Sequence, residues 1–111
     1  MQKLESIAEL AKLTDSNKDK SLLVYKHSYT CGICAAAYEV VQEFAASHPN
    51  ITIVMIDVLA NRDVSNRVAD VLHIKHESPQ AIAFINGSVV GHLNHWSIKT
   101  KALSNLFAPQ P

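Results

Sequence analysis

Two short apolar segments with an amphipathic helical pattern between them constrain the fold most. Residues 21–27 and 51–56 are rich in apolar and β-branched side chains, which is typical of buried strands. Between them, apolar side chains recur at helical spacing from Ile33 to Phe44, and Pro49 ends this pattern because it disfavours helical geometry in the residue before it. Such a strand–helix–strand unit predicts two parallel strands joined by a right-handed crossover.

The remaining patterns add an antiparallel hairpin and further helices to this unit. Residues 81–85 and 88–93 have strand character and flank Asn86-Gly87, and Asn-Gly is a strong signal for a two-residue hairpin turn. Helical patterns place three more helices at residues 3–13, 61–72 and 97–107. The sequence therefore predicts an α/β fold, with a mixed sheet of about four strands and helices on both faces.

Length and charge narrow the class of protein. The chain has 111 residues, 48% of them apolar, which suits one domain spanning residues 1–111. Its 10 basic residues balance 10 acidic ones, whereas nucleic acids and anionic membranes select basic surfaces. No apolar run is long enough to cross a bilayer, and charged side chains interrupt the N-terminal segment, unlike a signal peptide. We therefore expect a cytoplasmic protein with no nucleic-acid or membrane partner.

The two cysteines, Cys31 and Cys34, lie in one Cys-Gly-Ile-Cys segment between the first predicted strand and the long helix. A bridge across so short a loop constrains the unfolded chain little, so chemistry explains the pair better than stability. A helix N-terminus carries partial positive charge and unpaired N–H groups, which favour the thiolate form of a cysteine. Cys31 is therefore predicted as the exposed nucleophile and Cys34, one turn further along, as the resolving thiol. Gly32 leaves the backbone open to close approach by a substrate.

Cys-x-x-Cys also occurs in metal sites, so alternatives without redox catalysis stay open. A zinc site needs further ligands, and the candidate pairs His73/His76 and His92/His95 are spaced more tightly than zinc histidines usually are. An iron–sulfur cluster shared by two subunits, each giving Cys31, would also use thiolate ligands. The strand–motif–helix context favours redox chemistry with no metal and no bound cofactor.

Pro79 lies just before the strand predicted at residues 81–85. A proline there can simply mark a strand boundary, but the position resembles that of the cis-proline beside the reactive sulfur in the thioredoxin-like fold. This resemblance implies a cis bond between Ser78 and Pro79, with the Ser78 main chain facing Cys31. A bound substrate could then pair with this backbone as a short added strand.

Several short segments along the chain match one known family. They are Lys26-His-Ser-Tyr-Thr-Cys31, Asn61-Arg62, Val64-Ser65-Asn66, Lys75-His-Glu-Ser-Pro-Gln80 and His95-Trp-Ser-Ile98. On these segments the chain resembles the bacilliredoxins, specifically the small monothiol type of the bacillithiol system. The resemblance implies a thioredoxin-like fold and removal of bacillithiol, the co-substrate, from oxidised protein cysteines. Its partners would be bacillithiolated or disulfide-bonded proteins, and Cys31 matches the family's nucleophile.

The motif departs from the family pattern at two positions. Family members carry Cys-Pro-Ile-Ser, whereas this chain has Gly32 and Cys34. A second thiol allows an internal disulfide after the first exchange, and it could widen the activity to ordinary protein disulfides. A general dithiol protein-disulfide reductase is therefore one alternative, and a non-catalytic metal or iron–sulfur carrier is the other.

Lys26 and His27 precede the motif and are candidate substrate-binding residues. A cation beside Cys31 would lower the pKa of its thiol or attract an acidic small thiol. Because side chains alternate along a strand, we expect only one of the two to face the site. The other candidates for substrate binding are Thr30, Gly32, Ser78 and Pro79.

Overall fold

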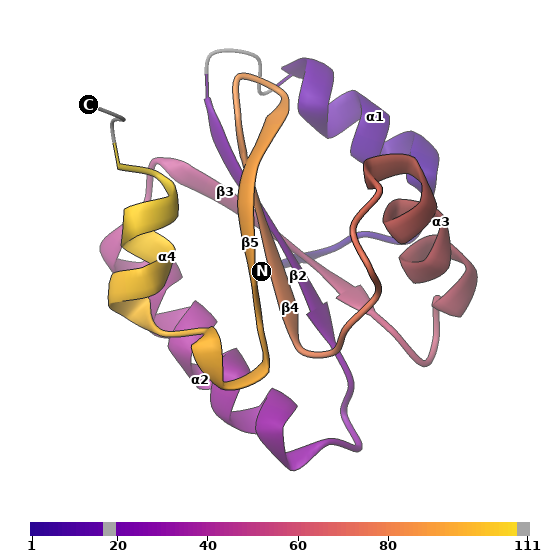
Figure 1. Ribbon diagram of the computed structural model, residues 1–111. Coiled ribbons are helices and arrows are strands. Elements are labelled where there is room, and N and C mark those ends of the chain that lie inside the picture. The colour runs from indigo at the N-terminus through magenta and orange to yellow at the C-terminus, as the bar shows by residue number, and fades with distance from the viewer. Residues whose placement is uncertain (17–19, 109–111) are drawn as a thin grey trace.

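The computed structural model describes residues 1–16 and 20–108, which form one mixed five-stranded sheet with helices on both faces (Figure 1). The strand order is β1-β3-β2-β4-β5. At the centre, β2 (Ser21–His27) runs parallel to β3 (Ile51–Asp57) and antiparallel to β4 (Gln80–Ile85). β5 (Ser88–Asn94) pairs with β4 as the predicted hairpin. The predicted α/β class, with a mixed sheet and a hairpin, is therefore confirmed.

Alternation along β2 divides the core into two layers. Leu22 and Val24 face α1 (Ile7–Ser16) and α3 (Arg62–Leu72), with which they form one buried cluster. Leu23 and Tyr25 belong to the other cluster, which they share with two further helices. These are α2 (Gly32–Ser47) and α4 (Thr100–Leu106), on the opposite face of the sheet (Figure 1). Both faces of β2 are thus buried, as a continuous apolar strand requires.

The N-terminal segment differs from the prediction. Gln2–Lys3 forms β1, a two-residue strand parallel to β3, and the helix predicted at residues 3–13 begins instead at Ile7. The sheet therefore has five strands rather than about four. A strand of two residues shows no alternation of its own, and it exists because it pairs with Val54 and Met55.

The C-terminal helix is also shorter than predicted. Residues 97–107 were expected to form one helix, but the structure has a 3₁₀ turn, η1 (His95–Ser97), followed by α4 from Thr100. None of the helices in the described part of the chain is long and apolar enough to span a membrane.

Candidate active site

Cys31 is the N-cap residue of α2, directly after the turn that follows β2. Its backbone is extended, with φ −113° and ψ 124°. Its N–H donates to the Ser28 carbonyl at 3.3 Å, and its carbonyl accepts from the Ala35 N–H at 3.2 Å. The Cys31 side chain is partly exposed and that of Cys34 is buried, and both thiols are free. The structure thus brings the two cysteines to the strand-to-helix junction that the sequence predicted.

The surroundings of the two thiols shift their pKa values in opposite directions. The pKa of Cys31 is lowered, chiefly by the backbone N–H of Cys34, then by the Cys34 side chain, and less by the N–H of Ile33. Burial raises the pKa of Cys34, and hydrogen bonds from Ser78 and Ser28 only partly oppose this effect. N–H groups in the first helical turn stabilise an anion at the N-cap because they have no partner within the helix. Cys31 is therefore the thiol better suited to attack.

The loop before β4 brings Ser78 to the buried thiol. The Ser78–Pro79 peptide bond is cis, as the resemblance implied. The Ser78 hydroxyl lies 3.4 Å from the Cys34 sulfur. The Pro79 carbonyl accepts a hydrogen bond from the His95 N–H at 2.9 Å, which ties the loop to η1. Binding of a substrate by the Ser78 main chain stays a prediction.

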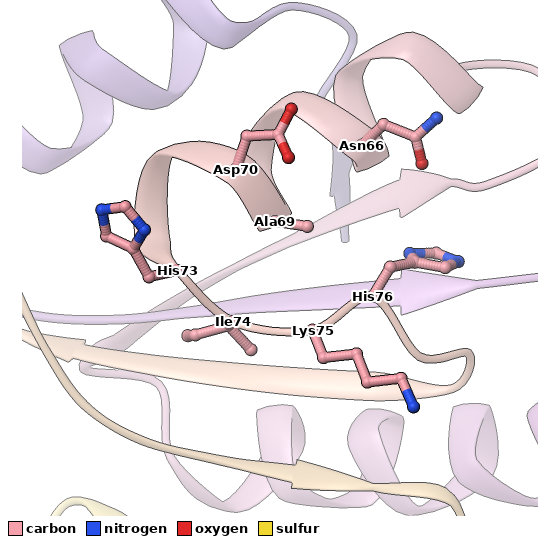
Figure 2. A pocket seen from close by; sticks show the side chains of 7 residues that line it. All are labelled: Asn66, Ala69, Asp70, His73, Ile74, Lys75 and His76. Carbon is pink, nitrogen blue, oxygen red and sulfur yellow. The ribbon is translucent and has the colours of Figure 1, made fainter.

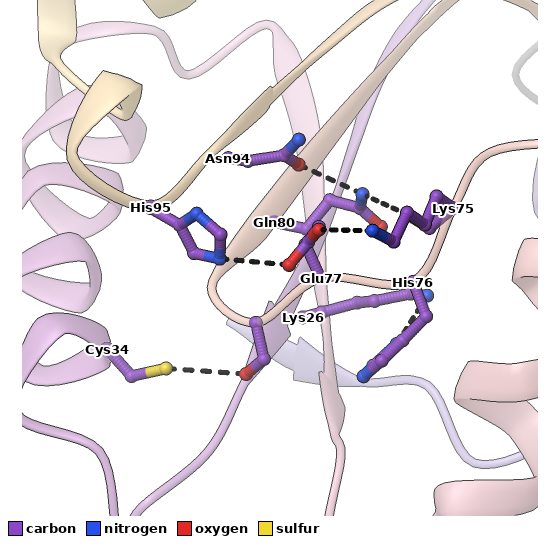
Figure 3. A network of polar contacts seen from close by, with 9 residues as sticks. Lys26, Cys34, Lys75, His76, Glu77, Gln80, Asn94 and His95 are labelled. Atoms are coloured by element: carbon purple, nitrogen blue, oxygen red, sulfur yellow. Dashed lines mark hydrogen bonds and ion pairs between the residues drawn. The ribbon is translucent and has the colours of Figure 1, made fainter.

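Side chains on this loop add further ties around Pro79. Glu77 pairs with His95 at 3.1 Å and with Lys75 at 3.7 Å (Figure 3). The Gln80 amide donates to the Lys75 carbonyl and to the Asn94 side chain, both at 2.9 Å. These contacts fix the loop from both sides, so the position of Ser78 does not depend on Cys34 alone.

Lys26 and His27 lie on opposite faces of the sheet, as strand alternation predicts. Lys26 is fully buried on the α3 face, and its ammonium donates to the Ser65 carbonyl at 3.0 Å and to Nδ1 of His76 at 3.2 Å (Figure 3). Burial lowers the pKa of Lys26 to about 8. Its ammonium is therefore engaged on the face away from Tyr25 and the cysteine-bearing helix.

On the α2 face, Tyr25 connects His27 to the cysteine segment. The Tyr25 hydroxyl donates to the Cys34 carbonyl at 3.1 Å and lies 2.9 Å from Nδ1 of His27. Since the phenol hydrogen is used by the carbonyl, Nδ1–H of His27 donates to the phenol oxygen. Burial lowers the pKa of His27, an effect that Asp57 opposes, and raises that of Tyr25. His27 is thus a neutral imidazole whose Nε2 is an acceptor.

Sequence reasoning did not single out Tyr25. The available signal was a phenol within a buried strand, since a buried hydroxyl needs a hydrogen-bond partner.

Gly32 and Thr30 lie at the surface beside Cys31. A Cβ added to Gly32 would meet no atom within 4 Å, so the folded chain itself does not require glycine there. The Thr30 hydroxyl lies 3.1 Å from that of Ser28, within the turn. Both residues leave the approach to Cys31 open.

A cavity of about 320 Å³ adjoins Cys31. One wall comes from α2 and the other from the end of β2 and the following turn. The lining residues are His27, Ser28, Tyr29, Cys31, Ala35, Tyr38, Glu39 and Gln42. A larger cavity, of about 640 Å³, lies between α3 and residues 73–76 (Figure 2), and neither cysteine lines it.

Across residues 1–16 and 20–108, no group of three or more His, Cys, Asp or Glu side chains could hold a metal ion.

Comparison with known proteins agrees with this geometry. The sequence profile of the monothiol bacilliredoxin BrxC family matches residues 2–103. The chain belongs to this bacilliredoxin family. A solved structure described as having a thioredoxin fold is 34% identical, with a TM-score of 0.89, and the match covers 96% of this chain and 93% of that one. This bacilliredoxin is therefore a thiol–disulfide oxidoreductase, as the sequence predicted.

Two more distant structures show the fold alone. Thioredoxin from Fasciola hepatica is 22% identical with a TM-score of 0.78, and the match covers 96% of this chain and 97% of that one. Mitochondrial thioredoxin 3 from Saccharomyces cerevisiae is 19% identical with a TM-score of 0.76, covering 95% of this bacilliredoxin and 91% of the yeast chain.

Proposed function

We propose that this bacilliredoxin reduces mixed disulfides between protein cysteines and bacillithiol, with Cys31 as nucleophile and Cys34 as resolving thiol. The observation that carries the proposal is the pair of thiols at the N-terminus of α2, one partly exposed with a lowered pKa and one buried with a raised pKa. A lowered pKa increases the thiolate fraction, and the thiolate is the species that attacks a disulfide. Membership of the bacilliredoxin family supports bacillithiol as the small thiol.

The reaction proceeds in two exchanges. The Cys31 thiolate attacks the bacillithiol sulfur of the mixed disulfide, a Cys31–bacillithiol bond forms, and the client cysteine leaves as a thiolate that takes up a proton. The Cys34 thiol then gives up its proton and its sulfur attacks the Cys31 sulfur, which releases bacillithiol and leaves a Cys31–Cys34 disulfide. An external thiol reductant supplies two electrons to restore both thiols. The protein needs no bound metal or cofactor for these steps.

We assign contact with the substrate to the residues that surround Cys31 on its exposed side. Thr30 and Gly32 flank the thiol, and His27 lines the adjoining cavity. The main chain at Ser78 and Pro79 would pair with the backbone of the client protein. Lys26 is not included, because its buried ammonium is engaged by Ser65 and His76.

Mass spectrometry of the protein mixed with a bacillithiolated client tests the proposal. Cys34→Ser should remove bacillithiol from the client and accumulate a Cys31–bacillithiol adduct, whereas the wild-type protein should accumulate the internal disulfide. Cys31→Ser is the matched control and should leave the client modified. The proposal is wrong if Cys34→Ser leaves the client modified, or if the adduct forms on Cys34 of the wild-type chain.

The contact between the two thiols favours a second candidate function, that of a general dithiol reductase. Such an enzyme reduces ordinary protein disulfides and needs both thiols for each turnover. If Cys34→Ser still removes bacillithiol but fails on a protein disulfide such as insulin, bacillithiol removal is the primary activity. If the wild-type protein reduces insulin faster than it removes bacillithiol, the dithiol function takes precedence.

A further inference from the structure

We infer that the cavity beside Cys31 is a specificity pocket, which holds the non-sulfur part of the small thiol while its sulfur is exchanged. This inference rests on the proposed function and adds to it a binding site and the chemistry of the ligand. The starting observation is that Cys31 lines a cavity of about 320 Å³, whereas the larger cavity along α3 contains neither cysteine. A disulfide partner attached to Cys31 therefore has an adjoining space to occupy.

One wall of the pocket is a single face of α2. Cys31, Ala35, Tyr38 and Gln42 follow one another at spacings of four, three and four residues, so they lie in a row along the helix. Helical side chains lean toward the N-terminus of their helix, which directs Ala35 and Tyr38 toward the thiol. At a rise of about 1.5 Å per residue, the row from Cys31 to Gln42 is about 16 Å long. That length suits a thiol of tripeptide size rather than one as small as mercaptoethanol.

The opposite wall is aromatic. The rings of His27 and Tyr29 meet edge to face with centroids 4.5 Å apart, and the ring of Tyr38, from α2, packs against His27 with centroids 5.0 Å apart. Tyr29 is 59% exposed although it is a large aromatic residue, so its ring is available to a ligand. Ala35, which also lines the cavity, contributes only a methyl group. Aromatic faces of this kind pack against the apolar face of a ring or a short chain.

The polar groups that line the pocket include a carboxylate but no ammonium or guanidinium group. Glu39 brings a carboxylate, Gln42 an amide, and His27 a neutral imidazole, since its pKa is lowered and Nδ1–H is used by Tyr25. Lys26, the cation nearest to Cys31 in the sequence, lies on the α3 side of the sheet, where its ammonium donates to the Ser65 carbonyl. The pocket therefore favours a ligand with hydroxyl, amide N–H or ammonium groups that can donate to Glu39, and it disfavours a carboxylate near that side chain.

Filling the pocket while sparing the thiol tests this inference. In a Cys34→Ser background, which isolates the first exchange, we compare Ala35→Leu with Ala36→Leu. Both alanines are exposed on α2, but only Ala35 lines the pocket. The rate constant for forming the Cys31 adduct is measured by mass spectrometry with bacillithiol disulfide and with 2-hydroxyethyl disulfide. The second compound has the same reactive disulfide bond but only a two-carbon group on each sulfur. We expect Ala35→Leu to slow bacillithiol disulfide at least tenfold and 2-hydroxyethyl disulfide less than twofold, with Ala36→Leu changing neither.

The outcomes separate the pocket from the proposed function. If Ala35→Leu leaves the rate with bacillithiol disulfide unchanged, or slows both disulfides equally, the pocket is not a specificity site, and the proposed function stands. If the background protein does not react with bacillithiol disulfide at all, the proposed function itself is wrong. Far-ultraviolet circular dichroism of both leucine variants checks that the helix is intact, and the rate with 2-hydroxyethyl disulfide checks that Cys31 is still reactive.

Discussion

Cys31 and Cys34 are three residues apart, yet they lie in different electrostatic environments. The first receives N–H groups from the turn that it caps, and the second is buried against Tyr25 and Ser78. A nucleophile and a resolving thiol need this difference. The attacking sulfur must be a thiolate, whereas the second sulfur reacts only after a mixed disulfide has formed. The N–H groups of the first turn of α2 and the burial of Cys34 together create this difference.

The difference should be visible in alkylation rates. In reaction with iodoacetamide, the rate of Cys34→Ser should reach half of its maximum at a pH below the midpoint for a free cysteine, because the backbone N–H of residue 34 remains in place. Cys31→Ser leaves only the buried thiol, and its rate should reach half of its maximum at a pH above the midpoint for a free cysteine. Equal midpoints for the two variants would show that the environments do not differ as described.

Ser78→Ala tests the contact that opposes the burial of Cys34. Removing the hydroxyl 3.4 Å from the sulfur should raise the pKa of Cys34 further. The Cys31–bacillithiol adduct should then persist longer, by about 2- to 10-fold, which corresponds to one net hydrogen bond. Stopped-flow mixing followed by acid quench and mass spectrometry measures its lifetime. Formation of the adduct serves as the internal control, because Cys31 keeps its own hydrogen bonds in this variant.

At the scale of secondary structure, elements with a strong pattern of their own were predictable and those held by distant partners were not. The bounds of β2 agree with the predicted residues 21–27 because every position from Leu22 to His27 is buried. β1 depends on β3, more than 45 residues away in the chain, and carries no pattern. The cysteines were found from a local motif and Pro79 from its resemblance to a position in a known fold. The Tyr25 contact and the pocket along α2 depend on side-chain packing, which neither signal reports.

Gly32→Pro, which introduces the proline of the family motif, is a test of α2 itself. Residue 32 is the first helical position, where proline is favoured because its missing N–H has no helical partner. Cys31 already has the extended backbone that a following proline requires, and an added Cβ meets no atom within 4 Å. We expect stabilisation by about 0.4–1 kcal/mol in urea unfolding of the reduced protein. A loss of stability would mean that the first turn of α2 has another geometry.

At the scale of the whole molecule, the sheet separates two clusters of ionisable groups. Cys31, Cys34, Tyr25 and His27 lie on the α2 side, and Lys26 lies on the α3 side with Ser65 and His76 as its partners. A buried ammonium that meets a carbonyl and an imidazole has lost its hydration without gaining a carboxylate. The free-energy cost of burying the Lys26 ammonium therefore lowers the stability of the fold rather than affecting the thiol chemistry.

That cost predicts how stability depends on pH. Lys26 has a pKa of about 8 in the folded protein, against about 10.4 in an unfolded chain. Between these values the unfolded chain binds more protons at this site, so the free energy of unfolding should rise with pH, by at most about 1.4 kcal/mol per pH unit. Below pH 8 both states are protonated and the full penalty remains. Above pH 10 the raised pKa of Tyr25 acts in the opposite direction, so the useful window is pH 8 to 10.

Urea unfolding across this window, in a Cys31→Ser/Cys34→Ser background that removes thiol titration, measures the slope. Lys26→Met should abolish the rise and should be more stable than its parent at pH 7, because it replaces a desolvated cation with an apolar chain of similar length. Lys75→Met is the matched control, since its side chain is 88% exposed and should leave the slope unchanged. If Lys26→Met keeps the slope of its parent, then the ammonium is hydrated in the folded protein, and its carbonyl and imidazole partners do not replace water.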